Sequence, residues 1–428
     1  MENGKYVIVR RNGQILSLLF HGSRLHSAHA QNAEEGENLL GSIYVAKVKN
    51  VVKNLHAAFV EIEAGRNCFL DLRDVKSPLL LNRKYDGKLA AGDEVVVQVY
   101  KEAVKTKPPS VTCALSLDGK YCVVTKGRAG IAYSAKLSAK TEEKIGMGLR
   151  ESPFPIAEYA REYGIIIRTN ARDLADDVTP LAEEIRDLAC RLAEIMQNGI
   201  HRTCYSVLMQ KPPAYLWKLR DLHTGWCDEI VTDDEGIYRE ILAFSNENQA
   251  YRLPPVRLYQ DGRLPLSKLY AVESRLKEAL ERKVWLKSGG YLLIEPTEAL
   301  TVIDVNTGKV VSRKEAADNH FLTNMEAAEE IAHQLILRNL SGIVIVDFIN
   351  MPKEEHRHAL MQRLGGLLRE DTVKTQLVDI TALGLVEITR MKTSRPLGEQ
   401  LGNREQTCPG QRGTGRQNTG KDGKDAVN

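Results

Sequence analysis

The chain has 428 residues, of which 43% are hydrophobic and 27% are charged, a composition typical of folded globular proteins. This length corresponds to about two to four domains. No stretch approaches the ~18 consecutive apolar residues that a membrane helix needs, and the first 20 residues lack the features of a signal peptide. The composition therefore excludes wholesale disorder, and we expect no membrane span.

The charges nearly balance, with 59 Lys and Arg against 56 Asp and Glu, so the net charge of +3 does not by itself indicate a nucleic-acid partner. Their distribution is uneven, because residues 39–112 carry 12 Lys and Arg against 8 Asp and Glu, and residues 113–150 carry 7 against 3. A polyanion would be attracted to this front part of the chain. The seven cysteines include no CxxC pair, which predicts free thiols in a reducing compartment, with the cytoplasm as the default.

The first half of the chain is rich in short strands. Residues 5–20 alternate around Asn12-Gly13, the strongest hairpin signal, and four or five strands follow between residues 41 and 100 at intervals of about ten residues. Evenly spaced short strands predict a small closed barrel, and the OB-fold is the commonest such barrel among nucleic-acid binders. After the break at 105–109 we expect helices near residues 135–149 and 179–196, with a buried strand at 164–167.

Strands and helices alternate in the second half. We expect a helix over 267–281, a pair of strands within 291–304, a long helix over 319–340, an apolar strand over 342–348 and a helix over 354–368. Apolar strands that alternate with helices are typical of an α/β domain with a sheet buried on both faces. From residue 402 the sequence is rich in Gly, Gln, Lys and Asn, which predicts disorder.

Two aspartates close apolar strands. Asp304 follows Leu-Thr-Val-Ile and Asp347 follows Ile-Val-Ile-Val, and ligands bind at the carboxyl ends of strands in α/β sheets. Together with Asn306, the two carboxylates could hold one Mg²⁺ and activate a water against a phosphodiester. The alternative is that they are ordinary strand-end residues that begin loops or cap helices.

Phe59 and Phe69 lie on neighbouring strands of the predicted barrel, among several lysines and arginines. Such a combination indicates a platform on which bases of a single strand stack, although the same residues could equally form the barrel core. Arg168 and Thr169 follow the strand 164–167 and could bind a phosphate, but the simpler interpretation is a surface arginine followed by a turn. We find no Gly-rich nucleotide loop and no nucleophile elbow, which argues against NTP hydrolysis and serine-hydrolase chemistry.

Three segments together resemble the catalytic region of the ribonuclease E/ribonuclease G endoribonucleases. They are LTVIDVNTGK (300–309), NMEAAEEIAHQLILRNLSG (324–342) and IVIVDFINM (343–351), and the resemblance extends from the N-terminus through GLVEITRMKTSRPLGE (384–399). It implies a multidomain α+β and α/β fold. An S1-type OB barrel (39–112) would be inserted in an RNase H-like domain split between 1–38 and 215–279. A 5′-sensor region (113–214), a DNase I-like catalytic domain (280–400) and a disordered tail (401–428) would complete the chain.

The resemblance also implies a function. The chain would be a magnesium-dependent endoribonuclease of RNA processing and decay (rRNA maturation and mRNA turnover) that cleaves single-stranded RNA to 5′-phosphate and 3′-hydroxyl ends, stimulated by a 5′-monophosphate. Its catalytic residues would be Asp304 and Asp347, the magnesium ligands, with Asn306 orienting the first. The other residues that it assigns are Phe59, Phe69 and Lys107 for RNA contact, and Arg168, Thr169 and the backbone of Val123 for the 5′-phosphate.

The sequence departs from the family at several of these places. Asn350 replaces an aspartate, and Ala135 stands where the phosphate pocket has a basic residue. Of the family's two-cysteine zinc link only Cys408 is present, with Gln411 in the second position, so a homodimer or higher oligomer is allowed but not required. The alternative function is a non-catalytic RNA-binding protein that uses the OB barrel; a structural factor has no residue in its favour.

Overall fold

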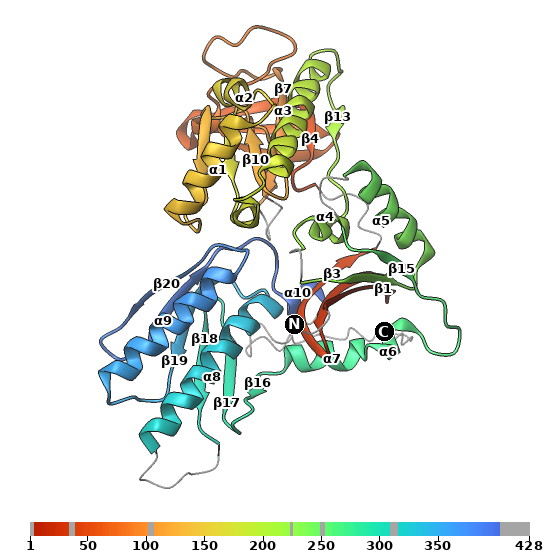
Figure 1. The fold of residues 1–428 in the computed structure, drawn as a ribbon. Helices are drawn as coiled ribbons and strands as arrows, with labels where there is room; N and C mark the ends of the chain where they lie inside the picture. Colours follow the sequence, from red (N-terminus) through yellow and green to blue (C-terminus); the bar gives the residue numbers. More distant parts are fainter. Residues whose placement is uncertain are drawn as a thin grey trace, which may run out of the picture. The chain divides into compact units, whose positions relative to one another are not determined.

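The computed structural model describes residues 4–33, 39–101, 107–222, 226–248, 253–308 and 316–402. The predicted tail, including Cys408, thus lies almost wholly outside the described residues. The chain divides into two compact units, residues 1–276 and 277–428, and each is described by itself (Figure 1). The fold is of the mixed α+β kind that the sequence predicts.

The first sheet of unit 1 is built from two segments that are far apart in the sequence. Its strand order is β15-β14-β1-β2-β3, and β1 pairs in parallel with β14, with Lys5 opposite Glu229. Helices α4 and α5 pack against it around Tyr6, Ile8 and their apolar neighbours. The β1–β2 hairpin turns at Asn12-Gly13, both with positive φ, which confirms the predicted hairpin. The bounds are β1 (Gly4–Arg11), β2 (Gln14–His21), β3 (Arg24–Asn32), β14 (Glu229–Thr232), β15 (Val256–Leu258), α4 (Ala214–Arg220) and α5 (Glu235–Glu247).

A closed β-barrel follows in the chain. Its five strands run in the order β4-β5-β6-β8-β7, and β7 pairs with β4 to close it, while β13 pairs with one end of β4. Alternate residues such as Val60, Cys68 and Leu70 fill the interior. The predicted closed barrel is therefore present. The bounds are β4 (Ile43–Val52), β5 (Ala57–Glu63), β6 (Arg66–Asp71), β7 (Glu94–Lys101), β8 (Ser110–Thr112) and β13 (Val207–Met209).

The third sheet of unit 1 has the strand order β11-β12-β10-β9 and packs against helices α1 to α3. The predicted strand at 164–167 is β12, and α3 covers the predicted helix at 179–196. Helix α1 begins at Ala139 rather than near residue 135, because the Ser138 hydroxyl accepts a hydrogen bond from Thr141 N–H and caps it. The bounds are β9 (Ser116–Asp118), β10 (Cys122–Thr125), β11 (Gly130–Tyr133), β12 (Gly164–Ile167), α1 (Ala139–Glu151), α2 (Ile156–Glu162) and α3 (Thr179–Gly199).

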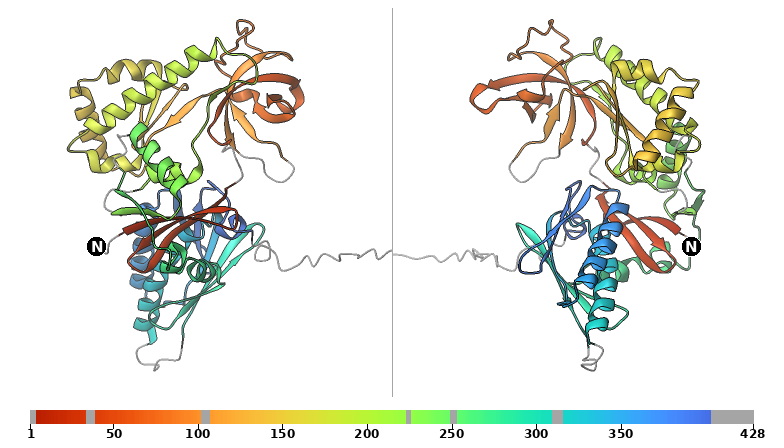
Figure 2. Two further views of the ribbon diagram at one scale, coloured as in Figure 1. Left: turned by 90° about the vertical axis from the view of Figure 1, so that its right-hand side faces the viewer. Right: turned by 60° about the vertical axis from the view of Figure 1, so that its left-hand side comes forward.

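The described strands of unit 2 form one sheet with the order β16-β17-β18-β19-β21-β20. Helices α8 and α9 lie side by side on one face of this sheet (Figures 1 and 2), and the core between them includes Ile303, Val305, Val344 and Val346. The alternation of strands and helices thus appears as predicted. The expectation of a sheet buried on both faces was wrong within unit 2, because α8 and α9 cover one face and the other face carries exposed residues such as Trp285. The bounds are β16 (Lys283–Trp285), β17 (Tyr291–Pro296), β18 (Leu300–Asn306), β19 (Gly342–Asp347), β20 (Thr375–Ile380), β21 (Val386–Arg390), α8 (Ala316–Leu337), α9 (Glu354–Glu370) and α10 (Leu397–Gln400).

The helix expected over 267–281 is broken in two. Helix α6 (Leu266–Leu269) ends where Tyr270 N–H and Ala271 N–H bond back to Leu266 and Lys268, and α7 (Val272–Leu280) begins one residue later. Ala271 has a φ of 47°, a left-handed conformation that ends a helix. The prediction of one continuous helix was wrong because its apolar periodicity continues across this turn.

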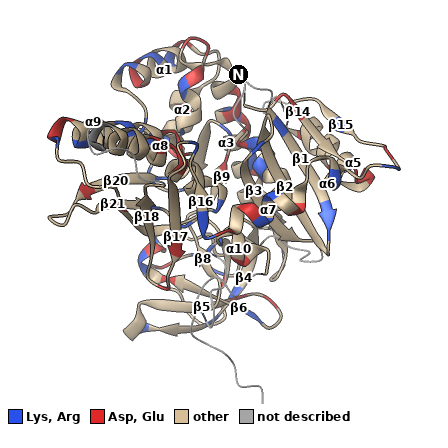
Figure 3. Ribbon diagram, turned by 90° about the horizontal axis from the view of Figure 1, so that it is seen from below, with Lys and Arg blue, Asp and Glu red and all other residues tan. Residues whose placement is uncertain are grey.

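The helices and strands carry charges of both signs. Lys and Arg are interspersed with Asp and Glu along the strands and helices of both units (Figure 3). Among the helices that the structure describes, none combines the length and the apolar character needed to cross a membrane.

Candidate functional site

Asp304 and Asp347 lie on neighbouring strands of unit 2: Asp347 ends β19, whereas Asp304 lies two residues before the end of β18 at Asn306. Strands β18 and β19 are parallel, and their register places Asp304 directly opposite Asp347. Because side chains of residues in register point to the same face of a sheet, the two carboxylates project side by side. Asp304 is half-buried and Asp347 is exposed. The two aspartates singled out in the sequence are therefore brought together by one strand pair.

The carboxylates lie on the face of the sheet opposite the helices. Ile303, Val305 and Val346 are buried in the core beneath α8 and α9, and residues alternate between the two faces along a strand. Asp304 and Asp347 thus point away from that core. We call this side of the sheet the carboxylate face.

An amide orients the first carboxylate. The Asn306 Nδ2 group donates a hydrogen bond to Asp304 Oδ2 over 2.7 Å, from the same face of the same strand. The amide nitrogen of Asn306, rather than its oxygen, faces Asp304, because an ionised carboxylate only accepts hydrogen bonds. This hydrogen bond restricts the Asp304 side chain; the orienting role that the resemblance implies for Asn306 stays a prediction.

A buried asparagine fixes the chain just after the second carboxylate. Asn324 on α8 is fully buried, donates from Nδ2 to Ile349 O over 2.7 Å and accepts from Ile349 N–H over 3.1 Å. This pair of bonds ties the loop after β19 to the helix. Sequence reasoning missed Asn324, although a polar residue on the apolar stripe of a helix is a signal for such a role.

The helix-capping interpretation of the aspartates is wrong. Helix α9 begins at Glu354, seven residues after Asp347, and its N-cap is Lys353. Helix α8 begins at Ala316, twelve residues after Asp304. Neither carboxylate is placed to cap the helix that follows it, and of the alternative interpretation only the part in which such residues begin loops is left.

The donor set suits a hard divalent cation that keeps part of its water shell. Within the part of the chain that the structure describes, no three His, Cys, Asp or Glu residues gather into a metal cage. Mg²⁺ does not need such a cage, because it is commonly held by one or two carboxylates together with waters and substrate phosphates. Asp304 and Asp347 fit that pattern, whereas a structural zinc site would need four ligands.

Phe59 and Phe69 face the outside of the barrel. They are directly opposite each other on β5 and β6, with ring centroids 6.2 Å apart at an interplanar angle of 79°. Their neighbours Val60 and Cys68 point inward and are fully buried, whereas both phenyl rings are partly exposed. The alternative that these rings form the barrel core is therefore wrong.

Lys107 lies on the segment that leads into β8, the strand that pairs with β6 at Phe69. It is exposed and lies two residues before Pro109, whose carbonyl accepts the backbone N–H of Phe69 over 2.8 Å. The outer surface of β5 and β6 thus carries two aromatic rings, and an exposed lysine lies on the segment that leads into the neighbouring strand β8. Proteins that bind single-stranded nucleic acids use this combination.

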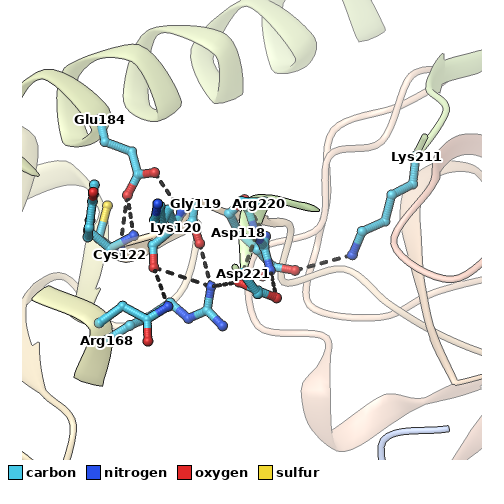
Figure 4. A network of polar contacts seen from close by, with 11 residues as sticks. Asp118, Gly119, Lys120, Cys122, Arg168, Glu184, Lys211, Arg220 and Asp221 are labelled. Carbon is cyan, nitrogen blue, oxygen red and sulfur yellow. Dashed lines mark hydrogen bonds and ion pairs between the residues drawn. The ribbon is translucent and has the colours of Figure 1, made fainter. Parts of the chain in front are cut away.

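Arg168 is part of a polar network rather than a free surface side chain. Its Nη1 group donates to Gly119 O over 2.6 Å and to Asp221 Oδ1 over 2.9 Å, and Asp221 also pairs with the buried Arg220 at 2.8 Å (Figure 4). Burial raises the pKa of Asp221, but Arg220 and Arg168 outweigh it, so this pKa lies below its usual value. Among the described residues, the Nε and Nη2 groups of Arg168 have no hydrogen-bond acceptor. They are the part of the guanidinium left for an anion.

Thr169 and Val123 lie close to Arg168 but in different settings. Arg168 N–H donates to Tyr121 O and continues the ladder in which Val123 faces Ile166. The Thr169 hydroxyl shares a hydrogen bond of 2.9 Å with Ser134. The structure thus gathers the three predicted phosphate-binding residues at one end of the β10–β12 pair.

Glu184 on α3 is a buried carboxylate whose role sequence reasoning missed. It accepts the backbone N–H groups of Lys120, Tyr121 and Cys122 over 2.6 to 2.9 Å (Figure 4). Burial raises its pKa, against the opposing effect of these bonds. A side chain at Gly119 would collide with it, since an added Cβ would lie 2.3 Å from the Glu184 carboxyl carbon. The signal for its burial was its place on the apolar stripe of α3.

We expect the substitution Glu184→Gln to destabilise unit 1 by about 2 kcal/mol, because an amide NH₂ would then face backbone N–H donors that lose their acceptor. A lower urea midpoint of unfolding measures this loss. Glu183→Gln is the matched control, since Glu183 lies next to it in the sequence without being buried. Equal midpoints for the two variants would contradict the role given to Glu184.

Comparison with known proteins identifies the family. The sequence model of the ribonuclease E/G family matches residues 116–393. Ribonuclease G of Escherichia coli (strain K12) is 34% identical over 405 residues, which cover 92% of this chain and 80% of that protein. The chain belongs to the ribonuclease E/G family. Ribonuclease G of Haemophilus influenzae is 32% identical, covering 87% of this chain and 76% of the relative, and ribonuclease E of a Nostoc strain is 32% identical, covering 89% and 55%.

Most of the candidate site residues lie within the region that the ribonuclease E/G family model matches. The matched region contains Asp304 and Asp347 on unit 2 and Arg168 on unit 1. The barrel with Phe59 and Phe69 precedes the region that the family model matches. The resemblance noted in the sequence is thus confirmed as membership of this family.

Proposed function

We propose that this chain is a magnesium-dependent endoribonuclease that cuts single-stranded RNA in RNA processing and decay, leaving 5′-phosphate and 3′-hydroxyl ends. The observation that carries the proposal is the register of β18 and β19, which sets Asp304 against Asp347 in a chain of the ribonuclease E/G family. A protein that only binds RNA gains nothing from two adjacent carboxylates, which repel a polyanion.

In this mechanism Asp304 and Asp347 would hold Mg²⁺, and Asn306 keeps the Asp304 carboxylate oriented. When bound, Mg²⁺ supplies the positive charge that activates water and offsets the charge developing on the phosphate. Asn324 keeps the chain after β19 in place through its two bonds to Ile349. These residues therefore preorganise the site, which is where most of the electrostatic stabilisation of a charged transition state originates.

The barrel would bind the single-stranded RNA. Phe59 and Phe69 offer two outward ring surfaces on which bases stack, and Lys107 provides a cation for the backbone. In the resemblance, 39–112 is an S1-type OB domain, 1–38 with 215–279 an RNase H-like domain and 280–400 a DNase I-like domain. The closed barrel, the sheet shared by two separated segments and the six-stranded sheet of unit 2 support this organisation.

We also propose that Arg168, Thr169 and the backbone of Val123 read a 5′-monophosphate. The two unengaged nitrogens of Arg168 support it, and the engagement of its Nη1 group with Asp221 shows that the guanidinium is held in one position. The test compares cleavage of the same RNA with a 5′-monophosphate and with a 5′-hydroxyl, together with the identity of the product ends. We expect faster cleavage of the monophosphate RNA and 5′-phosphorylated products. Equal rates for both RNAs would leave the nuclease proposal standing and contradict the sensing role.

We propose a reducing, cytoplasmic location on the basis of the thiols. The six cysteines within the described residues are all free, and four of them are buried. We also propose that the chain can form a homodimer or a higher oligomer. Cys408, the remaining cysteine of the family's zinc link, lies outside the described residues.

A further inference from the structure

An exposed aromatic pair lies beside the carboxylates on the same face of the sheet. Trp285 is 64% exposed at the end of β16, the outer strand among the described strands of this sheet. Its register partner on β17 is Tyr291, and Tyr291 is in turn opposite Asn306 on β18. Trp285, Tyr291 and Asn306 therefore form one row across the carboxylate face.

The next row contains the carboxylates themselves. Lys283 is opposite Leu293, Leu293 is opposite Asp304, and Asp304 is opposite Asp347. Neighbouring strands lie about 4.8 Å apart, so β16 is about 10 Å from β18. A lysine thus occupies one end of the row and the two aspartates occupy the other.

Lys283 of the second row contacts both aromatic rings of the first row. Its ammonium group lies 3.8 Å from the ring centroid of Trp285 and 3.7 Å from that of Tyr291, and the two rings are 5.4 Å apart at an angle of 63°. Cation–π attraction of this kind holds an aromatic ring in one orientation. The exposed surface of Trp285 is therefore a defined aromatic surface rather than a mobile side chain.

The hairpin that carries this pair is anchored to the body of unit 2. The Glu326 carboxylate on α8 accepts the backbone N–H groups of Lys287 and Ser288 at the tip of the β16–β17 hairpin. On the other side, Gly308 is pressed so closely against Gly289 that a Cβ on it would lie 2.0 Å from the Gly289 carbonyl oxygen. The hairpin and the end of β18 are thus held together, and the aromatic pair keeps its place relative to Asp304.

We propose that Trp285, Tyr291 and Lys283 form a nucleotide-binding platform next to the carboxylates, where a base of single-stranded RNA stacks on Trp285 and Lys283 attracts the phosphate backbone. The inference deepens the proposed function and rests on it. Two adjacent carboxylates repel RNA, so a cation in the same row is needed near them to keep the backbone in place. Aromatic rings accept any base, since every base has a stacking surface. The platform therefore holds a nucleotide that flanks the cleavage point.

The test uses the full chain and a short single-stranded RNA. The chain has three tryptophans, Trp217, Trp226 and Trp285, so quenching of intrinsic fluorescence by RNA in EDTA can be assigned by the variant Trp285→Phe. We expect quenching in the wild type and loss of most of it in Trp285→Phe. In Trp285→Ala we expect kcat/KM for cleavage to fall roughly tenfold, the effect of one lost stacking contact.

Leu322→Ala is the matched control, because Leu322 is 62% exposed on α8 in the same unit and is not part of the platform. We expect no change in cleavage or quenching for it. Unquenched wild type, or a Trp285→Ala variant that cleaves as fast as Leu322→Ala, would overturn the inference while the nuclease proposal stands. If wild type does not cleave RNA at all, the proposed function fails, and the quenching of Trp285 still decides whether a base stacks there.

Discussion

Replacing Asp304 or Asp347 with asparagine is expected to lower cleavage of single-stranded RNA in Mg²⁺ by on the order of 10³-fold. Asparagine keeps the size of the side chain but removes the negative charge that would hold the cation. The register of β18 and β19 places both residues at one point, so each single variant should lose nearly all of the activity. Initial rates with a labelled oligoribonucleotide measure the loss.

Binding and folding provide the controls for this prediction. Both variants should retain the wild-type affinity for RNA in EDTA, because they leave the aromatic rings of the barrel and of the platform on β16 and β17 unchanged. Asn306→Ala should have an intermediate effect, a loss of about 10- to 100-fold, since Asn306 orients a ligand without being one. If both aspartate variants cleave as well as the wild type, the catalytic site lies elsewhere.

The double substitution Phe59→Ala and Phe69→Ala is expected to weaken the binding of single-stranded RNA by roughly 100-fold. Each base that stacks on an aromatic ring contributes about 1–3 kcal/mol, and the two rings face outward from neighbouring strands. Fluorescence anisotropy with a labelled RNA in EDTA measures the affinity without cleavage.

Leu55→Ala is the matched control for the double variant. Leu55 is 63% exposed in the connection between β4 and β5, so it removes an exposed apolar side chain from the same domain. The variant should bind RNA as the wild type does. An equal loss of affinity in Leu55→Ala and in the double variant would show that the barrel responds to any loss of surface, and would contradict specific stacking.

Much of the carboxylate site could be predicted from local sequence. Asp304 and Asp347 each close a run of apolar residues, and a strand of this kind presents its last residue at the edge of a sheet. What the spacing could not give is that β18 and β19 are neighbours in the sheet with zero stagger between the two aspartates. That register depends on how α8, which connects β18 to β19, packs on the sheet, and the resemblance to the family implied only that the two aspartates act together.

The position of Phe59 and Phe69 was open in the sequence for a different reason. The β5 sequence places Phe59 in phase with Glu61 and out of phase with Val60, which would favour an outward ring. Glu61 is itself almost fully buried. Hydrogen bonds from Tyr205, Gly65 and Lys49 lower the pKa of its carboxyl group to about 2. The alternation of polar and apolar residues along β5 therefore does not predict which side chains point into the barrel. Only the closure of the strands decides which face is inside.

The network around Arg168 and Glu184 could not be predicted from spacing at all. Arg168 meets Asp221 across 53 residues, and Glu184 meets Tyr121 across 63. Both sets of partners come together only when separate strands and helices pack. The sequence indicated an exposed phosphate-binding arginine, and the structure shows one nitrogen of that arginine already in use.

The most direct test of the central claim is a single incubation of the full chain with a short single-stranded RNA labelled at its 3′ end, in Mg²⁺ and in EDTA. We predict internal fragments in Mg²⁺ and intact RNA in EDTA, with no fragments in either buffer for Asp304→Asn. Fragments of equal amount in both buffers, or RNA that is bound but uncut in both, would contradict a magnesium-dependent endoribonuclease built on Asp304 and Asp347.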